Sequence, residues 1–183
     1  EAAGRPVESL YRRHWSELEE EEWQTVVRQG RLTRPRLDAF MGYFLTVLLT
    51  REVQAHQLFP VTRTYVGLSA DRAEEFLREL TRYAAVYRLV DDLKVDDQGE
   101  RDSLARLRIV DTQTLMPLLL WLFANTDGEA RARSLRSLES YVIRRSVCRL
   151  TTANYNRLFL ELLRKLSAGE QPVDEVVSSF LGG

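Results

Sequence analysis

Apolar residues recur at intervals of three and four positions along most of the chain, with polar residues between them. This spacing places the apolar side chains on one face of an α-helix, whereas a half-buried strand needs alternation at every second position. No sustained alternation of the strand type occurs. The pattern therefore predicts an all-α fold, an irregular multi-helix bundle of about seven helices.

The N-terminal half is expected to hold three helices and one further segment that is either a short helix or irregular. The first helix is expected over residues 6–28, with residues 19–22 as a solvated acidic face. A second begins near Pro35, because proline suits a first helical turn. Residues 51–55 form a break, and Pro60 interrupts the short segment that follows. Ser69 is a plausible N-cap for the clearest amphipathic helix of the chain. The inward residues of the first helix are Leu10, Tyr11, Trp15, Leu18 and Trp23.

The C-terminal half is expected to hold five helices. They span residues 103–111, a stretch from Thr112 through the wholly apolar residues 115–123, residues 129–150, a helix capped by Thr151 or Thr152, and a last one opened by Pro172. A helix that is apolar on every side is buried all round. Val147 and Cys148 fall in the helical pattern of residues 129–150, where a buried position is the usual interpretation.

Composition narrows the function classes. The 26 basic and 27 acidic residues nearly cancel, so any contact with DNA must come from a local patch. A single cysteine excludes an internal disulfide and fits a cytoplasmic protein, and the longest apolar run is too short to span a membrane. At 183 residues the chain can bury one sizeable core, and we expect residues 1–183 to form a single helical domain.

Catalytic chemistry is thinly represented. Neither His14 nor His56 has the spacing of a metal site, and no phosphate-binding glycine loop or nucleophile motif occurs. We therefore expect no catalytic, cofactor-binding or metal-binding residues in this chain. The acidic residues between Asp91 and Glu100 lack the pattern of a calcium loop and are expected to form a solvated loop.

Clustered arginines are the most informative feature. Several on one helix can follow a DNA backbone, since a guanidinium pairs with phosphate through two hydrogen bonds. The alternative is a solvated face balanced by Glu129, Glu139 and Glu161, together with ion pairs between helices. One of the neighbouring Arg144 and Arg145 is expected to point inward to a carboxylate. The candidate DNA contacts are Arg131, Arg133, Arg136, Arg144, Arg145, Arg149, Arg157, Arg164 and Lys165.

Residues 138–148 (LESYVIRRSVC) and 151–159 (TTANYNRLF) resemble the GmrSD-type modification-dependent restriction endonucleases. In that family a glutamate, an aromatic residue and paired arginines precede a Thr/Asn-containing turn and a helix with a Leu-Phe pair. Weaker matches occur at residues 37–40 (LDAF), 43–46 (YFLT) and 116–120 (MPLLL). The matching region is the helical middle of the family, between a ParB-like nucleotide-hydrolysing domain and an HNH-type nuclease domain.

Both catalytic signatures of the family are absent from this sequence, so the resemblance implies a fragment of a larger multidomain protein. The parent would cleave covalently modified foreign DNA in defence against phage, using a nucleoside triphosphate and a divalent metal. The flanking catalytic domains of the same polypeptide would be partners, with this chain as a coupling and DNA-positioning segment. A freestanding helical module that binds another protein is the alternative, and an independent enzyme with an unrecognised site is a third. The sequence leaves homo-oligomerisation open.

Overall fold

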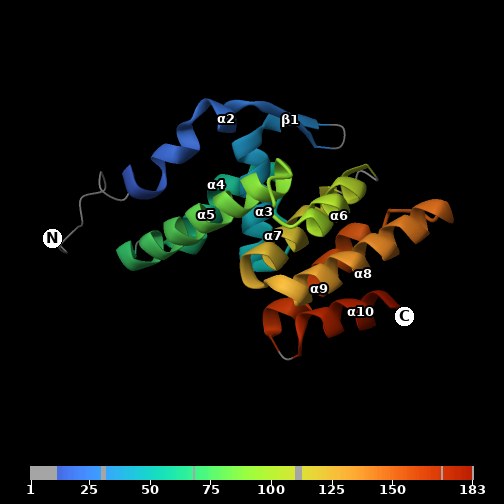
Figure 1. Ribbon diagram of the computed structural model, residues 1–183. Coiled ribbons are helices and arrows are strands. Elements are labelled where there is room, and N and C mark those ends of the chain that lie inside the picture. Colours follow the sequence, from blue (N-terminus) through green and yellow to red (C-terminus); the bar gives the residue numbers. More distant parts are fainter. Residues whose placement is uncertain (1–11, 30–31, 68, 110–112, 170, 183) are drawn as a thin grey trace.

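The computed structural model describes residues 12–29, 32–67, 69–109, 113–169 and 171–182. Helices dominate these residues, and the predicted all-α class is confirmed (Figure 1). The helices outnumber the seven expected, because short helical turns separate or precede the longer ones. A two-stranded antiparallel hairpin is the only β-sheet among the described residues.

The N-terminal segment differs most from expectation. It contains η1 (Ser16–Glu19), α2 (Glu21–Gln24), β1 (Val26–Gln29) and β2 (Leu32–Pro35), so the prediction of one helix through residue 28 is wrong. Consecutive β-branched residues at positions 25–27 favour extended backbone, and they lead into the hairpin. Leu18 and Trp23 are buried as expected. Leu10 and Tyr11 lie outside the described residues.

Helix α3 (Arg36–Leu49) follows Pro35, as predicted, and crosses the middle of the molecule. Phe40 and Phe44 are fully buried on its inner face and stack at a centroid distance of 6.1 Å. After η2 (Ala55–Gln57) comes α4 (Leu58–Val66). Pro60 does not interrupt α4, because it lies in the first turn, where its missing N–H has no intrahelical partner to lose.

Helix α5 (Ala70–Asp91) begins where the sequence predicted. The Ser69 hydroxyl accepts a hydrogen bond from the backbone N–H of Arg72 at 3.3 Å, which confirms the N-cap. Helix α6 (Gln98–Ile109) begins five residues earlier than expected. The Asp97 carboxylate accepts a bond from the N–H of Glu100 at 2.8 Å and so satisfies a free donor of its first turn.

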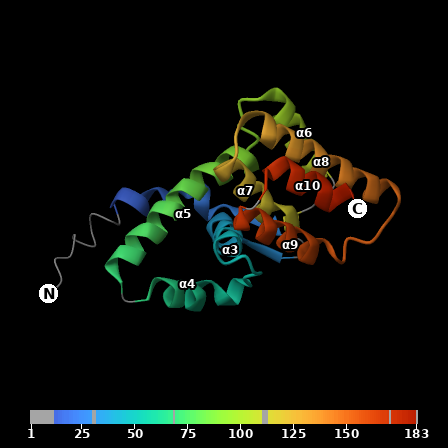
Figure 2. The ribbon, with the colours of Figure 1, turned by 90° about the horizontal axis from the view of Figure 1, so that it is seen from below.

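Four helices complete the chain: α7 (Met116–Asn125) after the short turn η3 (Gln113–Leu115), then α8 (Gly128–Val147), α9 (Tyr155–Ala168) and α10 (Val173–Gly182). Helices α8, α9 and α10 pack together on the side of α7 away from α5 (Figure 2). Val147 and Cys148 are exposed, so their expected burial is wrong. Helix α8 ends at Val147, and both residues lie on the exposed side of its C-terminus.

The core has two parts that meet at α7. One part is rich in aromatic rings from α2, α3 and α5, and includes Leu120 of α7. The other is mainly aliphatic and comes from α6 to α10, with Leu118, Leu119 and Leu122 of α7. Met116 and Trp121 pack against both parts. Helix α7 therefore joins them, which explains its apolar residues on several faces.

We expect Leu120→Ala to lower the free energy of unfolding by about 2–5 kcal/mol, because it removes a fully buried side chain where the two parts of the core meet. Leu89→Ala is the matched control, since Leu89 is 44% exposed, and its effect should stay below about 1 kcal/mol. Urea denaturation followed by circular dichroism measures both. Equal decreases in stability would contradict a central role for α7.

Candidate functional site

Two of the nine candidate DNA-contact residues bind carboxylates. Arg131 donates from Nε to Oε1 of the buried Glu100 at 2.7 Å, and its guanidinium lies 4.7 Å from the centre of the Phe123 ring. Arg133 pairs with Asp174 at 2.7 Å and with Glu129 at 2.7 Å. These contacts link α8 to α6 and to α10. The structure therefore places Arg131 and Arg133 in interhelical ion pairs.

Of Arg144 and Arg145, Arg145 is the one that points inward, but the prediction that its partner is a carboxylate is wrong. Its guanidinium lies 5.6 Å from the Tyr141 ring centre and 5.5 Å from that of Tyr155, and donates to the Thr151 carbonyl at 2.8 Å. A guanidinium is attracted to the negative face of an aromatic ring. The nearby Glu139 binds Arg106 and Ser103 instead.

Arg164 and Lys165 on α9 are held by uncharged groups. Arg164 donates to the Thr50 carbonyl at 2.8 Å, which ties α9 to the end of α3. The ammonium of Lys165 lies 5.0 Å from the centre of the Phe180 ring on α10. Both side chains are exposed and keep their charge at the surface.

Four candidates remain, which we call the outer arginines: Arg136, Arg144, Arg149 and Arg157. All four are exposed, and none has a carboxylate partner among the described residues. Arg136 and Arg144 line an open groove of about 480 Å³ between α8 and α10. Arg149 lies in the turn that joins α8 to α9, and Arg157 lies in the first turn of α9. Glu161, expected to balance this face, forms no ion pair with a described residue.

The turn after α8 holds its arginines at a helix C-terminus. Arg149 adopts a left-handed conformation with φ of 52°, and the N–H of Leu150 bonds to the Arg145 carbonyl at 2.9 Å. This pattern closes the helix and satisfies its last carbonyls. The partial negative charge of a helix C-terminus favours cations there. Positive charge is therefore stabilised at this end of α8.

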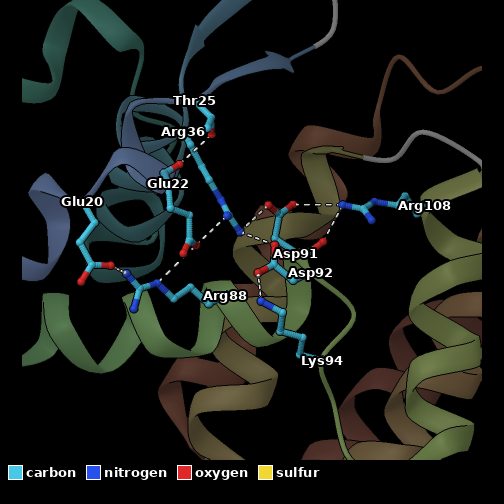
Figure 3. Close-up of polar contacts among 9 residues, drawn as sticks. All are labelled: Glu20, Glu22, Thr25, Arg36, Arg88, Asp91, Asp92, Lys94 and Arg108. Atoms are coloured by element: carbon cyan, nitrogen blue, oxygen red, sulfur yellow. Dashed lines mark hydrogen bonds and ion pairs between the residues drawn. The ribbon is translucent and has the colours of Figure 1, made fainter.

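A second polar site, not predicted from the sequence, surrounds Arg36 at the start of α3 (Figure 3). The Arg36 side chain is only 7% exposed and binds three carboxylates: Glu22 at 2.7 Å, Asp91 at 2.9 Å and Asp92 at 2.7 Å. The guanidinium also lies 5.2 Å from the centre of the Tyr87 ring. We call these five residues the Arg36 cluster.

Further cations surround the cluster (Figure 3). Arg88 binds Glu20 at 2.8 Å and Glu22 at 3.4 Å, while Lys94 binds Asp92 at 2.9 Å. Arg108 of α6 donates to the backbone carbonyl of Asp91 at 2.6 Å. The N-terminal segment, α3, α5 and α6 are thereby tied together at one place.

Several acidic residues expected to be solvated are therefore structural. Glu22, Asp91 and Asp92 bind Arg36, and Glu100 is 3% exposed and binds Arg131. Only Asp96 and Asp97 of the expected acidic loop are exposed. The members of the Arg36 cluster are separated by up to 70 positions along the chain, so no local spacing could have indicated them.

Burial raises the pKa of Asp92, but hydrogen bonds from Lys94 and Arg36 and the charge of Arg36 outweigh this effect, and the pKa lies below its ordinary value. For Glu139, burial is likewise outweighed by hydrogen bonds from Arg106 and Ser103, so its pKa is also lowered. Both carboxylates are therefore more strongly stabilised as anions in the fold than in the unfolded chain.

The described residues contain no group of three or more His, Cys, Asp and Glu side chains that could hold a metal ion. His14 shares a hydrogen bond with Thr81 at 3.3 Å, and His56 is exposed. In the described part of the chain, none of the helices has the length and apolarity needed to cross a membrane.

Comparison with family models, with curated proteins and with solved structures finds no match for the chain. The resemblance carried by residues 138–159 thus stays a prediction. Within those residues, the structure places Arg145 against Tyr141 and Tyr155, so part of the motif supports the turn between α8 and α9.

We expect Arg36→Met to lower the free energy of unfolding by about 3–5 kcal/mol, because three carboxylates then remain gathered around a site that has no guanidinium. Arg78→Met, on the exposed face of α5, is the control and should change stability by less than about 0.5 kcal/mol. Chemical denaturation at neutral pH measures both. A decrease for Arg36→Met no larger than that of the control would show that the cluster does not hold the fold together.

Asp92 should also make stability depend on pH. Its pKa is lowered on folding, so its contribution is fully present above the unfolded value of about 3.9 and disappears as the pH falls through the lower folded value. Asp92→Asn should therefore be less stable than the wild type at pH 7, and the difference should shrink below about pH 4. Urea midpoints across this range test the prediction. Asp96→Asn, at an exposed position, serves as the control. A stability difference between the wild type and Asp92→Asn that stays constant with pH would contradict the prediction.

Proposed function

We propose that this chain is a non-catalytic helical module that positions DNA on its outer arginines and couples the parts of a larger endonuclease that flank it. The proposal rests on the exposure of the outer arginines and on the carboxylates they lack among the described residues. Interhelical ion pairs account for Arg131 and Arg133 but leave these four guanidinium groups exposed and, among the described residues, without a carboxylate. Phosphate is the partner that several such groups on adjacent elements fit best.

The arrangement of the outer arginines supports contact with a backbone rather than with single bases. They extend along α8 and around the turn into α9. Arg136 and Arg144 open into one groove beside Ser137, Ser140 and Ser178, and of the two carboxylates that also line this groove Asp174 is paired with Arg133. Hydroxyl groups and arginines are common donors to phosphate oxygens, and such contacts orient DNA without reading its sequence. The module would therefore hold a duplex, while other parts of the parent recognise the modification and cleave.

A series of ion pairs supports the coupling role. The Arg36 cluster joins the N-terminal segment to α3 and α5, and Arg108 joins Asp91 at the end of α5 to α6. Glu100 with Arg131 then joins α6 to α8. Arg133 with Asp174 then joins α8 to α10. Close-packed elements move as units and transmit displacements. A movement at the N-terminal segment would reach the last helix through these pairs.

The nature of the parent rests on the resemblance of residues 138–159 to GmrSD-type enzymes. On this basis the parent would cleave modified foreign DNA, and its flanking catalytic domains would bind a nucleoside triphosphate and a divalent metal. The cofactors are assigned to those domains and not to residues of this chain.

A protein-binding module is the second candidate, and a specific observation favours it. Helix α4 has no buried residue, and Phe59 is 75% exposed on it. Exposed aromatic side chains are enriched in protein interfaces. The two candidates differ in how binding responds to salt, because phosphate contacts release counterions and weaken steeply as salt rises.

Neutralising the four outer arginines to glutamine should weaken binding of a short DNA duplex at least tenfold at low salt. The slope of the logarithm of affinity against the logarithm of salt concentration should fall by roughly 0.9 for each phosphate that the variant no longer binds. The matched control replaces four other exposed arginines by glutamine, at positions 51, 63, 72 and 78, and so removes the same charge from α4, α5 and the end of α3.

Fluorescence anisotropy measures both variants, with circular dichroism to establish that they fold. Weaker binding in the first variant alone supports the proposal. Equal weakening in both variants would reduce the effect to net charge, and no salt-dependent binding by the wild type would leave the protein-binding module as the better explanation.

A further inference from the structure

A cavity of about 350 Å³ lies where β1, α3, the end of α5, α6 and η3 with α7 meet. Its volume falls within the range of roughly 300–1,000 Å³ that is usual for small-molecule sites. None of the outer arginines lines it, so it is separate from the surface proposed to hold DNA.

The walls of the cavity are apolar and buried. They include Ala39, Val90, Leu104, Leu107, Leu115 and Leu119, each at most 6% exposed. The Tyr43 and Tyr87 side chains complete the lining on the side of α3 and α5. Side chains around an apolar space lack contact partners on one side, and a bound apolar group would restore those dispersion contacts. The interior thus fits a flat aromatic or similarly apolar body.

The mouth of the cavity is basic. Arg28 of β1 and Arg108 of α6 both line it and both are exposed, unlike the apolar residues of the walls. Asp91 is the one carboxylate among the described lining residues, and its two oxygens already face Arg36 at 2.9 Å and Arg108 at 3.4 Å. Among the described lining residues, two side chains are therefore basic and one is acidic.

Arg108 has donors to offer a ligand. Its hydrogen bonds to described residues all leave from one terminal nitrogen of the guanidinium and all go to Asp91. A guanidinium carries five N–H donors in a planar fork that fits carboxylate, phosphate and sulfonate groups. The bond to the Asp91 carbonyl holds the guanidinium at the rim with its remaining donors unbound by described residues.

We infer that this cavity binds a small organic anion with an aromatic body. The body lies among the leucines and beside the two tyrosines, and the anionic group binds Arg108 and Arg28 at the mouth. Arg36 holds the end of α5, which carries Asp91, against α3, and Arg108 holds it against α6, so the walls of the cavity are fixed relative to one another. This inference does not depend on the proposed contact with DNA.

Two fluorescent probes with the same ring system test the inference. Anilinonaphthalene sulfonate carries an anionic group, and phenylnaphthylamine lacks it. The wild type should bind the sulfonate at one site and more tightly than the neutral probe. Arg108→Gln should weaken binding of the sulfonate by roughly tenfold, the effect of one hydrogen bond to a charged group, and leave the neutral probe unchanged. Arg78→Gln, on the exposed face of α5, is the control and should alter neither affinity.

Ala39→Leu should weaken binding of both probes, because the larger side chain fills the cavity. The thermal stability of this variant should be unchanged or raised. A folded Ala39→Leu protein that binds both probes as the wild type does would overturn the inference, because the probes would then bind elsewhere. Should that variant not fold, Leu119→Phe fills the cavity from α7 with a smaller increase in volume. If Arg108→Gln weakens binding of the two probes equally, the inference that the ligand's anionic group binds Arg108 is wrong.

Discussion

The fold depends on one buried cation. Arg36 is removed from water at the start of α3, and a charge in that position is stable only because three carboxylates and an aromatic face surround it. Burial also raises the pKa of Tyr87, whose ring lies against the guanidinium, so the phenol stays neutral beside it. Glu22, Asp91 and Asp92 come from two separate segments. The ion pairs that Arg36 needs therefore fix where the N-terminal segment and the end of α5 lie relative to α3.

The arginines of this chain divide into two groups according to what they contact. Arg36 and Arg131 have carboxylate partners that are themselves partly or fully buried, and they hold helices together. Arg136 and Arg149 face solvent without such a partner among the described residues. A nearly neutral protein can in this way carry a local basic surface. The inward arginines neutralise much of the acidic charge that a simple count would set against the outer ones.

The two parts of the core differ in the kind of side chain that fills them. Stacked aromatic rings of α3 and α5 surround Trp23, whereas leucines of α6 to α9 form the other part. The rigid rings and the leucines do not fill the space completely where they meet around Ala39 and Leu107, and the cavity lies there. The same junction passes through α7, so any movement between the two parts would change the shape of the cavity.

The sequence by itself determined the helical class, the N-cap at Ser69 and the start of α3 after Pro35, because these follow from apolar spacing and capping chemistry within a few residues. Only the tertiary structure decided the hairpin, the exposure of Cys148, the partners of Arg145 and the Arg36 cluster. The physical reason is that helix periodicity is local, whereas a buried charge is satisfied by groups far along the chain. Which arginines turn inward is set by the positions of those groups in the folded protein.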